Sequence, residues 1–209
     1  MGAFVAIDFE TADAGWDSAC AVALVRVEAG VVVRREQRLV RPPRSRFAYT
    51  HVHGIRWQDV ERCGPFGEVW PDLEPVLAGA DFLAAHNASF DRRVLEACCG
   101  VAGLAPPRLP WRCTVQTARA AWRLFPTRLP DVCRFLGIPL VHHDALSDAE
   151  ACARIVVAAQ ALVGGGASPR AEVGLVHYGT REACDRLPTT PSSPSSRRPT
   201  TSGATSAGC

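Results

Sequence analysis

Lysine is absent from this chain of 209 residues, so arginine supplies all 23 of its strongly basic side chains. Arginine suits contacts with phosphate because its planar guanidinium presents several donors, although a GC-rich coding sequence explains the bias equally well. The formal net charge is only +2. Such a charge neither requires nor excludes a polyanionic partner such as nucleic acid.

Long apolar segments are also missing. No apolar run reaches 18 residues, and no basic segment followed by a long apolar one stands at the N-terminus. We therefore expect a soluble, cytoplasmic protein that has no membrane partner. The nine cysteines are an odd number and include no C-x-x-C pair, which argues against a zinc site or thioredoxin-like chemistry and favours a reduced compartment.

The remaining composition is typical of a globular protein with a buried core, because 47% of the residues are apolar and 21% are charged. We expect one catalytic domain over residues 1–165 and a C-terminal extension over 166–209. From about residue 187 the extension is rich in Ser, Thr, Pro and Gly and nearly free of apolar residues. Such a segment cannot bury enough surface to offset its ordering entropy, and we expect it to be disordered.

Short apolar segments alternate with helical patterns along the domain. Strand formers predict strands at 3–9, 20–27 and 31–40, and the turn-like Glu28-Ala29-Gly30 predicts a hairpin of the last two. Apolar spacing interrupted by two prolines predicts a kinked or split helix over 66–78. Further patterns predict strands at 81–86 and near Cys113, and helices at 88–101, 117–125, 129–137 and 147–162. This order favours an α/β fold with some parallel strands.

Two acids stand at the end of the first predicted strand. Asp8 and Glu10 are two residues apart, so their side chains lie on the same face of the sheet. Paired carboxylates on a rigid strand are suitable ligands for Mg²⁺ or Mn²⁺. Taken alone, the pair favours the alternative, a strand end that carries two solvated acids.

A third acid, Asp91, lies in the first turns of the helix that follows the strand at 81–86. Asn87 is four residues earlier, so we expect it to cap this helix and to share a face with Asp91. That face would point toward the strand ends. The alternative is a cap followed by an ordinary surface aspartate.

The fourth acid, Asp148, stands at the start of the last predicted helix, and His143 comes five residues earlier. Ser147 and Glu150 have the spacing of a capping box, which would place Asp148 in the first helical turn, where the helix dipole favours its ionised form. His143 would lie on the preceding loop, free to approach the same site. The alternative for this histidine is a loop residue bonded to the backbone.

Three motifs thus occur in order: Asp8-Phe9-Glu10-Thr11, then His86 to Asp91, then His143 to Asp148. Their order and spacing resemble the DnaQ-like, DEDDh exonucleases, whose motifs read D-x-E-T, H-N-x-x-F-D and H-x-A-x-x-D. The resemblance covers residues 3–160. It includes the intervening stretches His53-Gly54-Ile55, Phe66 to Pro71 and Leu136-Gly137-Ile138.

This resemblance implies an RNase H-like fold, a mixed central β-sheet flanked by helices. It also implies a metal-dependent 3′→5′ exonuclease that acts on a nucleic-acid 3′ end, DNA favoured, and releases nucleoside 5′-monophosphates. Two Mg²⁺ or Mn²⁺ ions would be held by Asp8, which bridges both, by Glu10 and Asp148 at the first ion, and by Asp91 at the second. His143 would be the general base.

The resemblance further implies substrate contacts by Phe9, Thr11 and Asn87, although Phe9 is also consistent with a plain core residue. A DNA polymerase or another replication or repair protein is the implied partner. The sequence departs from the family pattern at Ala12-Asp13 and at two prolines, Pro126 and Pro130, and these changes bear on substrate preference more than on catalysis. Two alternatives stay open: a ribonuclease that trims short RNA, and a nucleic-acid-binding subunit without catalysis.

Overall fold

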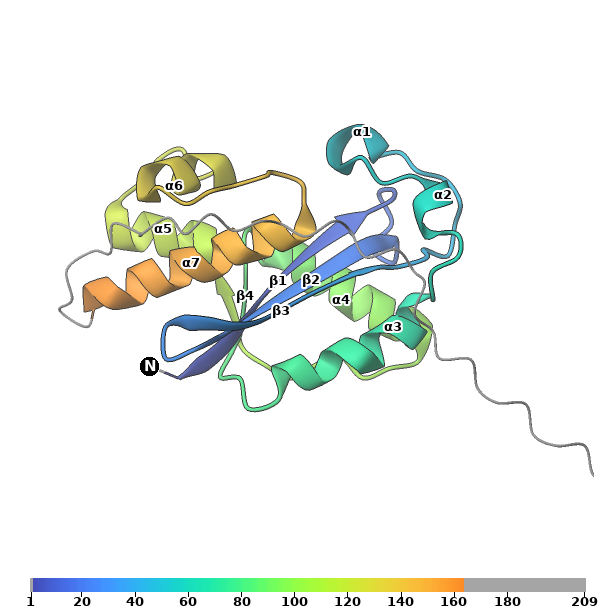
Figure 1. Cartoon of the computed structure of the whole chain (residues 1–209), viewed down its shortest axis with the longest axis horizontal. Helices are drawn as coiled ribbons and strands as arrows, with labels where there is room; N and C mark the ends of the chain where they lie inside the picture. The colour runs from blue at the N-terminus through green and yellow to red at the C-terminus, as the bar shows by residue number, and fades with distance from the viewer. Residues whose placement is uncertain (1, 164–209) are drawn as a thin grey trace, which may run out of the picture.

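The computed structural model describes residues 2–163, and a five-stranded sheet lies at its centre (Figure 1). The strand order is β3-β2-β1-β4-β5. Strands β1, β2 and β3 are antiparallel neighbours, whereas β4 runs parallel to both β1 and β5. The predicted mixed α/β sheet is therefore confirmed. Its strands are β1 (Ala3–Thr11), β2 (Ala19–Glu28), β3 (Val31–Leu39), β4 (Leu83–Ala85) and β5 (Trp111–Cys113).

The predicted hairpin joins β2 to β3. Its two turn residues, Ala29 and Gly30, have φ angles of 50° and 84°, in the left-handed region. Glycine adopts this region without steric cost, and two consecutive positive φ angles match the twist of the flanking strands. The turn-like composition of this segment therefore correctly predicted the hairpin.

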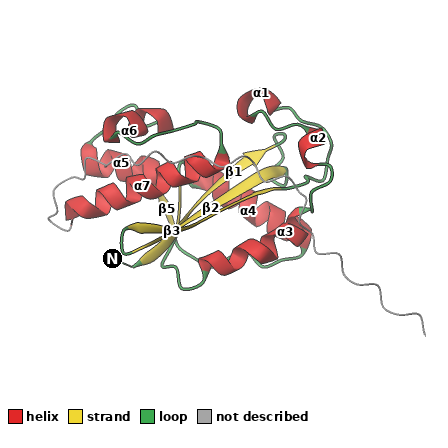
Figure 2. Cartoon of the chain, viewed as in Figure 1, coloured by secondary structure: helices red, strands yellow, loops and turns green. Residues whose placement is uncertain are grey.

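Helices cover both faces of the sheet (Figure 2). The predicted split over residues 66–78 is confirmed, because a helix gives way to a 3₁₀ turn at Glu74. The helix predicted at 117–125 in fact begins at Thr114, and two helices of four residues each were not predicted. The helices are α1 (Thr50–His53), α2 (Trp57–Val60), α3 (Phe66–Leu73), η1 (Glu74–Leu77), α4 (Ser89–Ala102), α5 (Thr114–Trp122), α6 (Leu129–Leu136) and α7 (Ala145–Val163).

Alternation along β1 assigns its side chains to two separate cores. Val5 and Ile7 pack in the cluster that contains residues of α3 and α4, whereas Phe4 and Ala6 pack in the cluster that contains residues of α7. Figure 1 shows these helices on opposite sides of the sheet. Because side chains alternate along a strand, Asp8 lies on the α7 side of the sheet.

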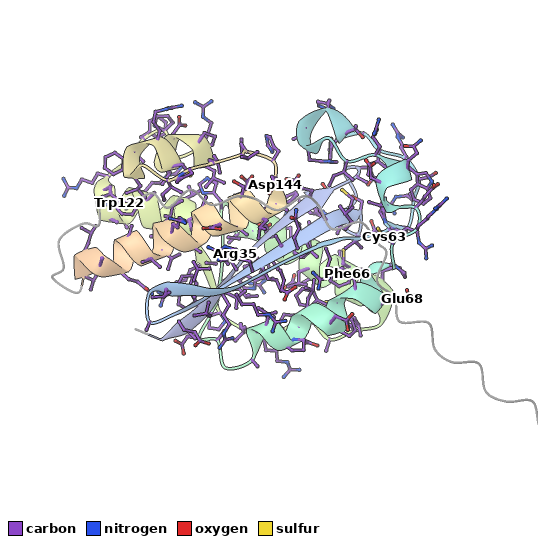
Figure 3. The ribbon with its side chains drawn as sticks, viewed as in Figure 1. Arg35, Cys63, Phe66, Glu68, Trp122 and Asp144 are labelled. Atoms are coloured by element: carbon purple, nitrogen blue, oxygen red, sulfur yellow. The ribbon has the colours of Figure 1, made fainter. Side chains whose placement is uncertain are left out.

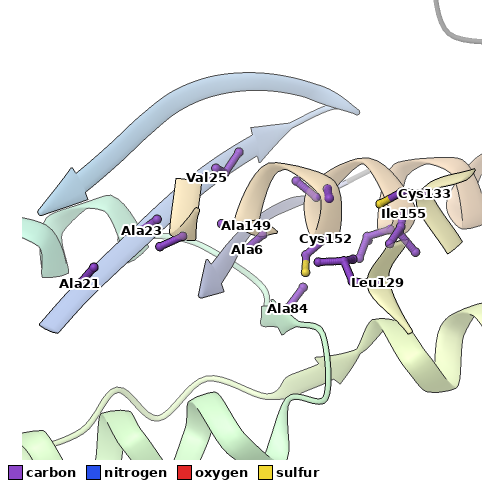
Figure 4. Close-up of a cluster of buried hydrophobic side chains, with 14 of the residues drawn as sticks. Ala6, Ala21, Ala23, Val25, Ala84, Leu129, Cys133, Ala149, Cys152 and Ile155 are labelled. Atoms are coloured by element: carbon purple, nitrogen blue, oxygen red, sulfur yellow. The ribbon is translucent and has the colours of Figure 1, made fainter. Parts of the chain in front are cut away.

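Small side chains let α7 pack close to the sheet (Figure 4). Ala6 and Ala84 on the strands face Ala149 and Cys152 on the helix, and all four are buried. Small residues on both surfaces shorten the distance between a helix and a sheet. The start of α7 is thereby brought next to the end of β1.

A buried ion pair also fixes α7 on the sheet. Glu150, only 1% exposed, bonds Arg35 of β3 at 2.8 Å and Arg154 at 2.7 Å. Arg35 is labelled on its strand in Figure 3. A buried carboxylate needs such partners, and Glu150 stands two residues after Asp148. The pairing therefore helps to position Asp148.

The predicted capping box at α7 is wrong. The helix begins at Ala145, and Oδ1 of Asp144 accepts a hydrogen bond from the backbone N–H of Ser147 at 3.0 Å. Asp144 is labelled at this end of α7 in Figure 3. The Ser147 hydroxyl accepts instead from the backbone N–H of Val141 at 2.8 Å. Asp148 nevertheless lies in the first turn, as predicted.

No helix within residues 2–163 is long and apolar enough to cross a membrane. Helix α7 ends at Val163, the last described residue. The predicted C-terminal extension over 166–209, including its expected disorder from about residue 187, lies outside the described residues.

Candidate active site

Three of the predicted acids meet where β1 ends and α7 begins. Carboxylate oxygens of Asp8, Glu10 and Asp148 all lie within 4.8 Å of one another. Glu10 and Asp148 are 8% and 4% exposed. Strand alternation places the first two acids on the α7 side of the sheet, and the close packing of α7 supplies the third.

The fourth acid reaches the same place from the other side of the sheet. Asp91, in the first turn of α4, is 2% exposed, and its Oδ1 accepts a hydrogen bond from the backbone N–H of Phe9 at 3.2 Å. Its charge raises the pKa of Asp8. The structure thus brings together all four predicted acids, which we call the acidic cluster: Asp8, Glu10, Asp91 and Asp148.

Burial and mutual repulsion make ionisation of this cluster costly. Burial is the main cause that raises the pKa of Asp91 to about 8 and that of Asp148 to about 7. The pKa of Asp8 is raised well above its ordinary value, first by burial and then by the charges of Asp91, Asp148 and Glu10. A bound cation would relieve this repulsion.

The donor atoms fit a divalent cation. Oδ1 of Asp148 is buried and has no hydrogen-bond partner among residues 2–163, an arrangement that is costly unless another ligand satisfies the oxygen. Neighbouring carboxylates from Asp8 and Glu10 supply further hard oxygen donors. Mg²⁺ and Mn²⁺ prefer such ligands.

Two adjacent histidines flank Asp148. Nδ1 of His142 lies 3.0 Å from Oδ2 of Asp148, and the backbone N–H of His143 donates to the same oxygen at 3.1 Å. The two rings stack at 3.8 Å between centroids. Burial lowers the pKa of both histidines, so that both rings are neutral near neutral pH. The structure therefore brings His143 to the site as predicted, and His142 with it.

Three of the acids and both histidines line a cavity of about 1090 Å³, namely Asp8, Glu10, Asp148, His142 and His143, whereas Asp91 is buried beside them. Tyr49 and His53, at the start and end of the α1 region, line one wall, and the segment from Phe125 to Arg134 lines another. Figure 1 shows α1 and α6 on the same side of the sheet, toward opposite ends. The site is therefore at the base of an open cavity whose walls come from distant parts of the sequence.

The three predicted substrate contacts all line this cavity. Phe9 is only 3% exposed and packs against Phe66, with ring centroids 6.5 Å apart, which supports its reading as a core residue. Thr11 is 7% exposed. Asn87 is exposed.

The predicted capping role of Asn87 is wrong. The residue before α4 is Ala88, and no described side chain caps the helix. Asn87 has a φ of 62°, outside the helix, and its Oδ1 accepts a hydrogen bond from the hydroxyl of Ser89 at 3.3 Å. It therefore shares no helical face with Asp91, which the backbone of Phe9 positions instead.

Two further histidines support the site. Nδ1 of His53 accepts from the backbone N–H of Ile55 at 3.1 Å, so Nε2 carries the proton and donates to the carbonyl of Thr11, also at 3.1 Å. This contact ties α1 to the end of β1. Burial lowers the pKa of His86 to about 4, and its Nδ1 lies 2.8 Å from the hydroxyl of Thr114. Both histidines belong to motifs that the sequence displays, although it does not indicate these contacts.

Solved structures with the same fold place the chain in a class. Exonuclease X in complex with 5′ overhanging duplex DNA is 25% identical with a TM-score of 0.62, over 79% of this chain and 95% of that one. The nuclease domain of 3′hExo, a DEDDh family member, bound to rAMP is 20% identical with a TM-score of 0.63. The match covers 78% of this chain and 92% of that one. The chain shares the fold of these exonucleases, and the predicted RNase H-like fold is confirmed.

Sequence comparison gives the family. A family model described as exonuclease matches residues 5–156, and the chain belongs to this family, of the DnaQ-like, DEDDh type. It is 31% identical to a PolC-type DNA polymerase III from Bacillus cereus over 162 residues, 74% of this chain and 11% of that protein. It is also 31% identical to exodeoxyribonuclease 10 from Escherichia coli over 147 residues, which are 65% of this chain and 59% of that protein. The chain thus spans only part of these relatives.

Proposed function

We propose that this chain is a divalent-metal-dependent 3′→5′ exonuclease that hydrolyses terminal phosphodiester bonds, DNA favoured, and releases nucleoside 5′-monophosphates. The observation that carries the proposal is the approach of Asp8, Glu10 and Asp148 within 4.8 Å beside two histidines in one cavity. Membership of the exonuclease family supports a nuclease. Divalent ions are implied by that family.

The acidic cluster would hold two Mg²⁺ or Mn²⁺ ions. Asp8 would bridge both, Glu10 and Asp148 would complete the first site, and Asp91 would serve the second. When bound, the ions would supply charge that stabilises the attacking and leaving oxygens of the displacement. Without them, the carboxylates would repel a phosphate.

His143 would act as the general base, and take the proton of the attacking water. Its lowered pKa leaves the ring neutral and able to accept a proton near neutral pH. The backbone N–H of His143 is bonded to Asp148, which holds the residue next to the acidic cluster. Phe9, Thr11 and Asn87 would contact the terminal nucleotide from their places along the cavity.

The names of two relatives support DNA as the substrate, since one is a DNA polymerase III and the other an exodeoxyribonuclease. The first also suggests a polymerase, or another replication or repair protein, as partner. A cytoplasmic location follows from such a role. Each of these three points is part of the proposal.

The test is an assay of nucleotide release from single-stranded DNA, duplex DNA and RNA in parallel, with and without Mg²⁺. Substrates labelled at the 5′ end and at the 3′ end give the polarity, and chromatography identifies the product. We expect mononucleotides from the 3′ end, in Mg²⁺ only, with DNA degraded faster than RNA. Internal cuts or metal-independent release would contradict the proposal.

A further inference from the structure

An exposed phenylalanine stands at the mouth of the cavity. Phe125, between α5 and α6, is 84% exposed, compared with 54% for Phe135 and 42% for Trp16. A single exposed apolar side chain carries little information by itself. Phe125, however, lines the same cavity as Asp8, Glu10 and Asp148, so its ring is available to a molecule that enters the site.

Arginines line the same cavity. The charged residues of α5, of α6 and of the segment between them that line the cavity are Arg119, Arg128, Asp131 and Arg134, three positive and one negative. Arg128 and Arg134 are 79% and 77% exposed and share Asp131 at 2.8 and 3.3 Å. Exposed ion pairs of this kind are weak, which leaves both guanidinium groups free to exchange Asp131 for phosphate. The outer wall is thus positive where the base of the cavity is negative.

The segment that carries Phe125 is anchored on its inner side. The hydroxyl of Thr127 accepts a hydrogen bond from Nε of Arg119 at 3.2 Å, and the backbone of Thr127 bonds the ring of His86. Thr127 and Leu129 are 6% and 3% exposed. Trp122, labelled in Figure 3, is the last residue of α5 and comes before this segment in the chain. Phe125 therefore projects from a fixed support.

We propose that Phe125, Arg119, Arg128 and Arg134 form a strand-binding platform for an unpaired nucleic-acid strand on its way to the acidic cluster. Phe125 stacks on a base of that strand, and the arginines bind its phosphates. The platform rests on the proposed function, since it specifies an unpaired strand as the substrate of the same site. It is separate from Phe9, Thr11 and Asn87, which serve the terminal nucleotide.

Stacking explains why the strand must be unpaired. A base inside a duplex already has both faces stacked, whereas a base in a single strand can place one face on an aromatic ring. Every base has such a face, so the contact tolerates any sequence. The platform therefore predicts a preference for single-stranded ends over blunt duplex ends, without a preference for base identity.

The experiment compares two substrates in Mg²⁺. One is a single-stranded DNA of about ten nucleotides, long enough to cover an aromatic platform. The other is the p-nitrophenyl ester of thymidine 5′-monophosphate, which offers a single nucleotide. For Phe125→Ala, the ratio of kcat/KM on the oligonucleotide to kcat/KM on the ester should fall by about 5-fold to 150-fold, the usual effect of losing one base–aromatic stack.

Two matched variants complete the test. Phe125→Tyr keeps an aromatic face and should retain the wild-type ratio. Phe135→Ala removes an exposed phenylalanine of α6 that does not line the cavity, and should also retain it. An unchanged ratio in Phe125→Ala, or an equal loss in Phe125→Tyr, overturns the platform. An equal loss by Phe125→Ala on single-stranded and blunt duplex DNA overturns its restriction to unpaired strands.

Failure of the nuclease proposal can be distinguished from failure of the platform. If the wild-type protein hydrolyses neither substrate, the nuclease proposal fails, and the platform is then judged by binding alone. Fluorescence anisotropy with a labelled oligonucleotide in Ca²⁺ measures affinity without turnover. Weaker binding by Phe125→Ala than by the wild type and Phe135→Ala supports the platform, and equal binding refutes it.

Discussion

Nδ1 of His142 lies 3.0 Å from Oδ2 of Asp148, and this same oxygen accepts the backbone N–H of His143. The side chain of His142 is therefore engaged with an acid of the cluster, whereas His143 makes its contact with Asp148 through the backbone. This difference supports different roles for the two histidines: His142 orients Asp148, and the ring of His143 receives a proton.

We predict that His143→Ala lowers turnover by about 10²- to 10⁴-fold, the usual effect of removing a positioned general base. Metal binding should survive, because the carboxylates are untouched. His142→Ala should have a far smaller effect on turnover. Both variants are compared at one pH and saturating Mg²⁺. Equal activities, or a greater loss in His142→Ala, would refute the assignment of the base.

A second prediction concerns pH and the stability of the metal-free protein. The pKa of Asp91 is about 8 in the fold, against an ordinary 3.8. Between these values the folded state keeps a proton that the unfolded state has lost, so stability falls as pH rises from about 4 to about 8. Asp91→Asn removes this dependence and keeps an oxygen that can accept the Phe9 amide.

In EDTA, Asp91→Asn should therefore unfold at a higher temperature than the wild type, and the difference should grow between pH 5 and pH 8. An increase of about 1 kcal/mol in the difference between their free energies of unfolding corresponds to roughly 2–4 °C in unfolding temperature for a protein of this size. Thermal unfolding followed by circular dichroism gives both values. A difference that stays constant with pH would mean that the Asp91 carboxyl is not destabilised by its burial.

Much of the site could be predicted from sequence because its acids stand in regular elements. Asp8 and Glu10 share a face through strand alternation, and Asp148 follows a loop into the first turn of a helix. These relations depend on local geometry. Their convergence is tertiary, and it was inferred from the ordered motifs of a family, which spacing alone does not provide.

The errors arise where local signals compete. Ser147 and Glu150 have capping-box spacing, yet Asp144 caps the helix and Glu150 is drawn into the ion pair with Arg35. Asn87 adopts a positive φ instead of capping α4. Helix α1 has only four residues, too few for a periodic pattern, so its histidine contact with β1 has no local signal.

A third prediction concerns the extension. Truncation after Gly166 should leave a folded and active exonuclease, because the three motifs and the described elements all lie upstream. Residues 171–186 include apolar positions, which makes a second truncation after residue 186 a useful control. An insoluble or inactive protein from the shorter form, with activity in the longer one, would show that 167–186 belongs to the domain.

If the acidic cluster holds catalytic divalent ions, removal of the Asp8 carboxylate should be the most damaging single change to the site. Asp8 lies among the other acids, so its removal should disrupt both ion sites while relieving repulsion in the metal-free fold. The measurement is mononucleotide release from single-stranded DNA in Mg²⁺, with thermal unfolding of the same samples. We predict that Asp8→Ala abolishes release and that it unfolds at or above the wild-type temperature. Near-normal turnover in this variant would contradict the assignment of the acidic cluster as a catalytic ion site.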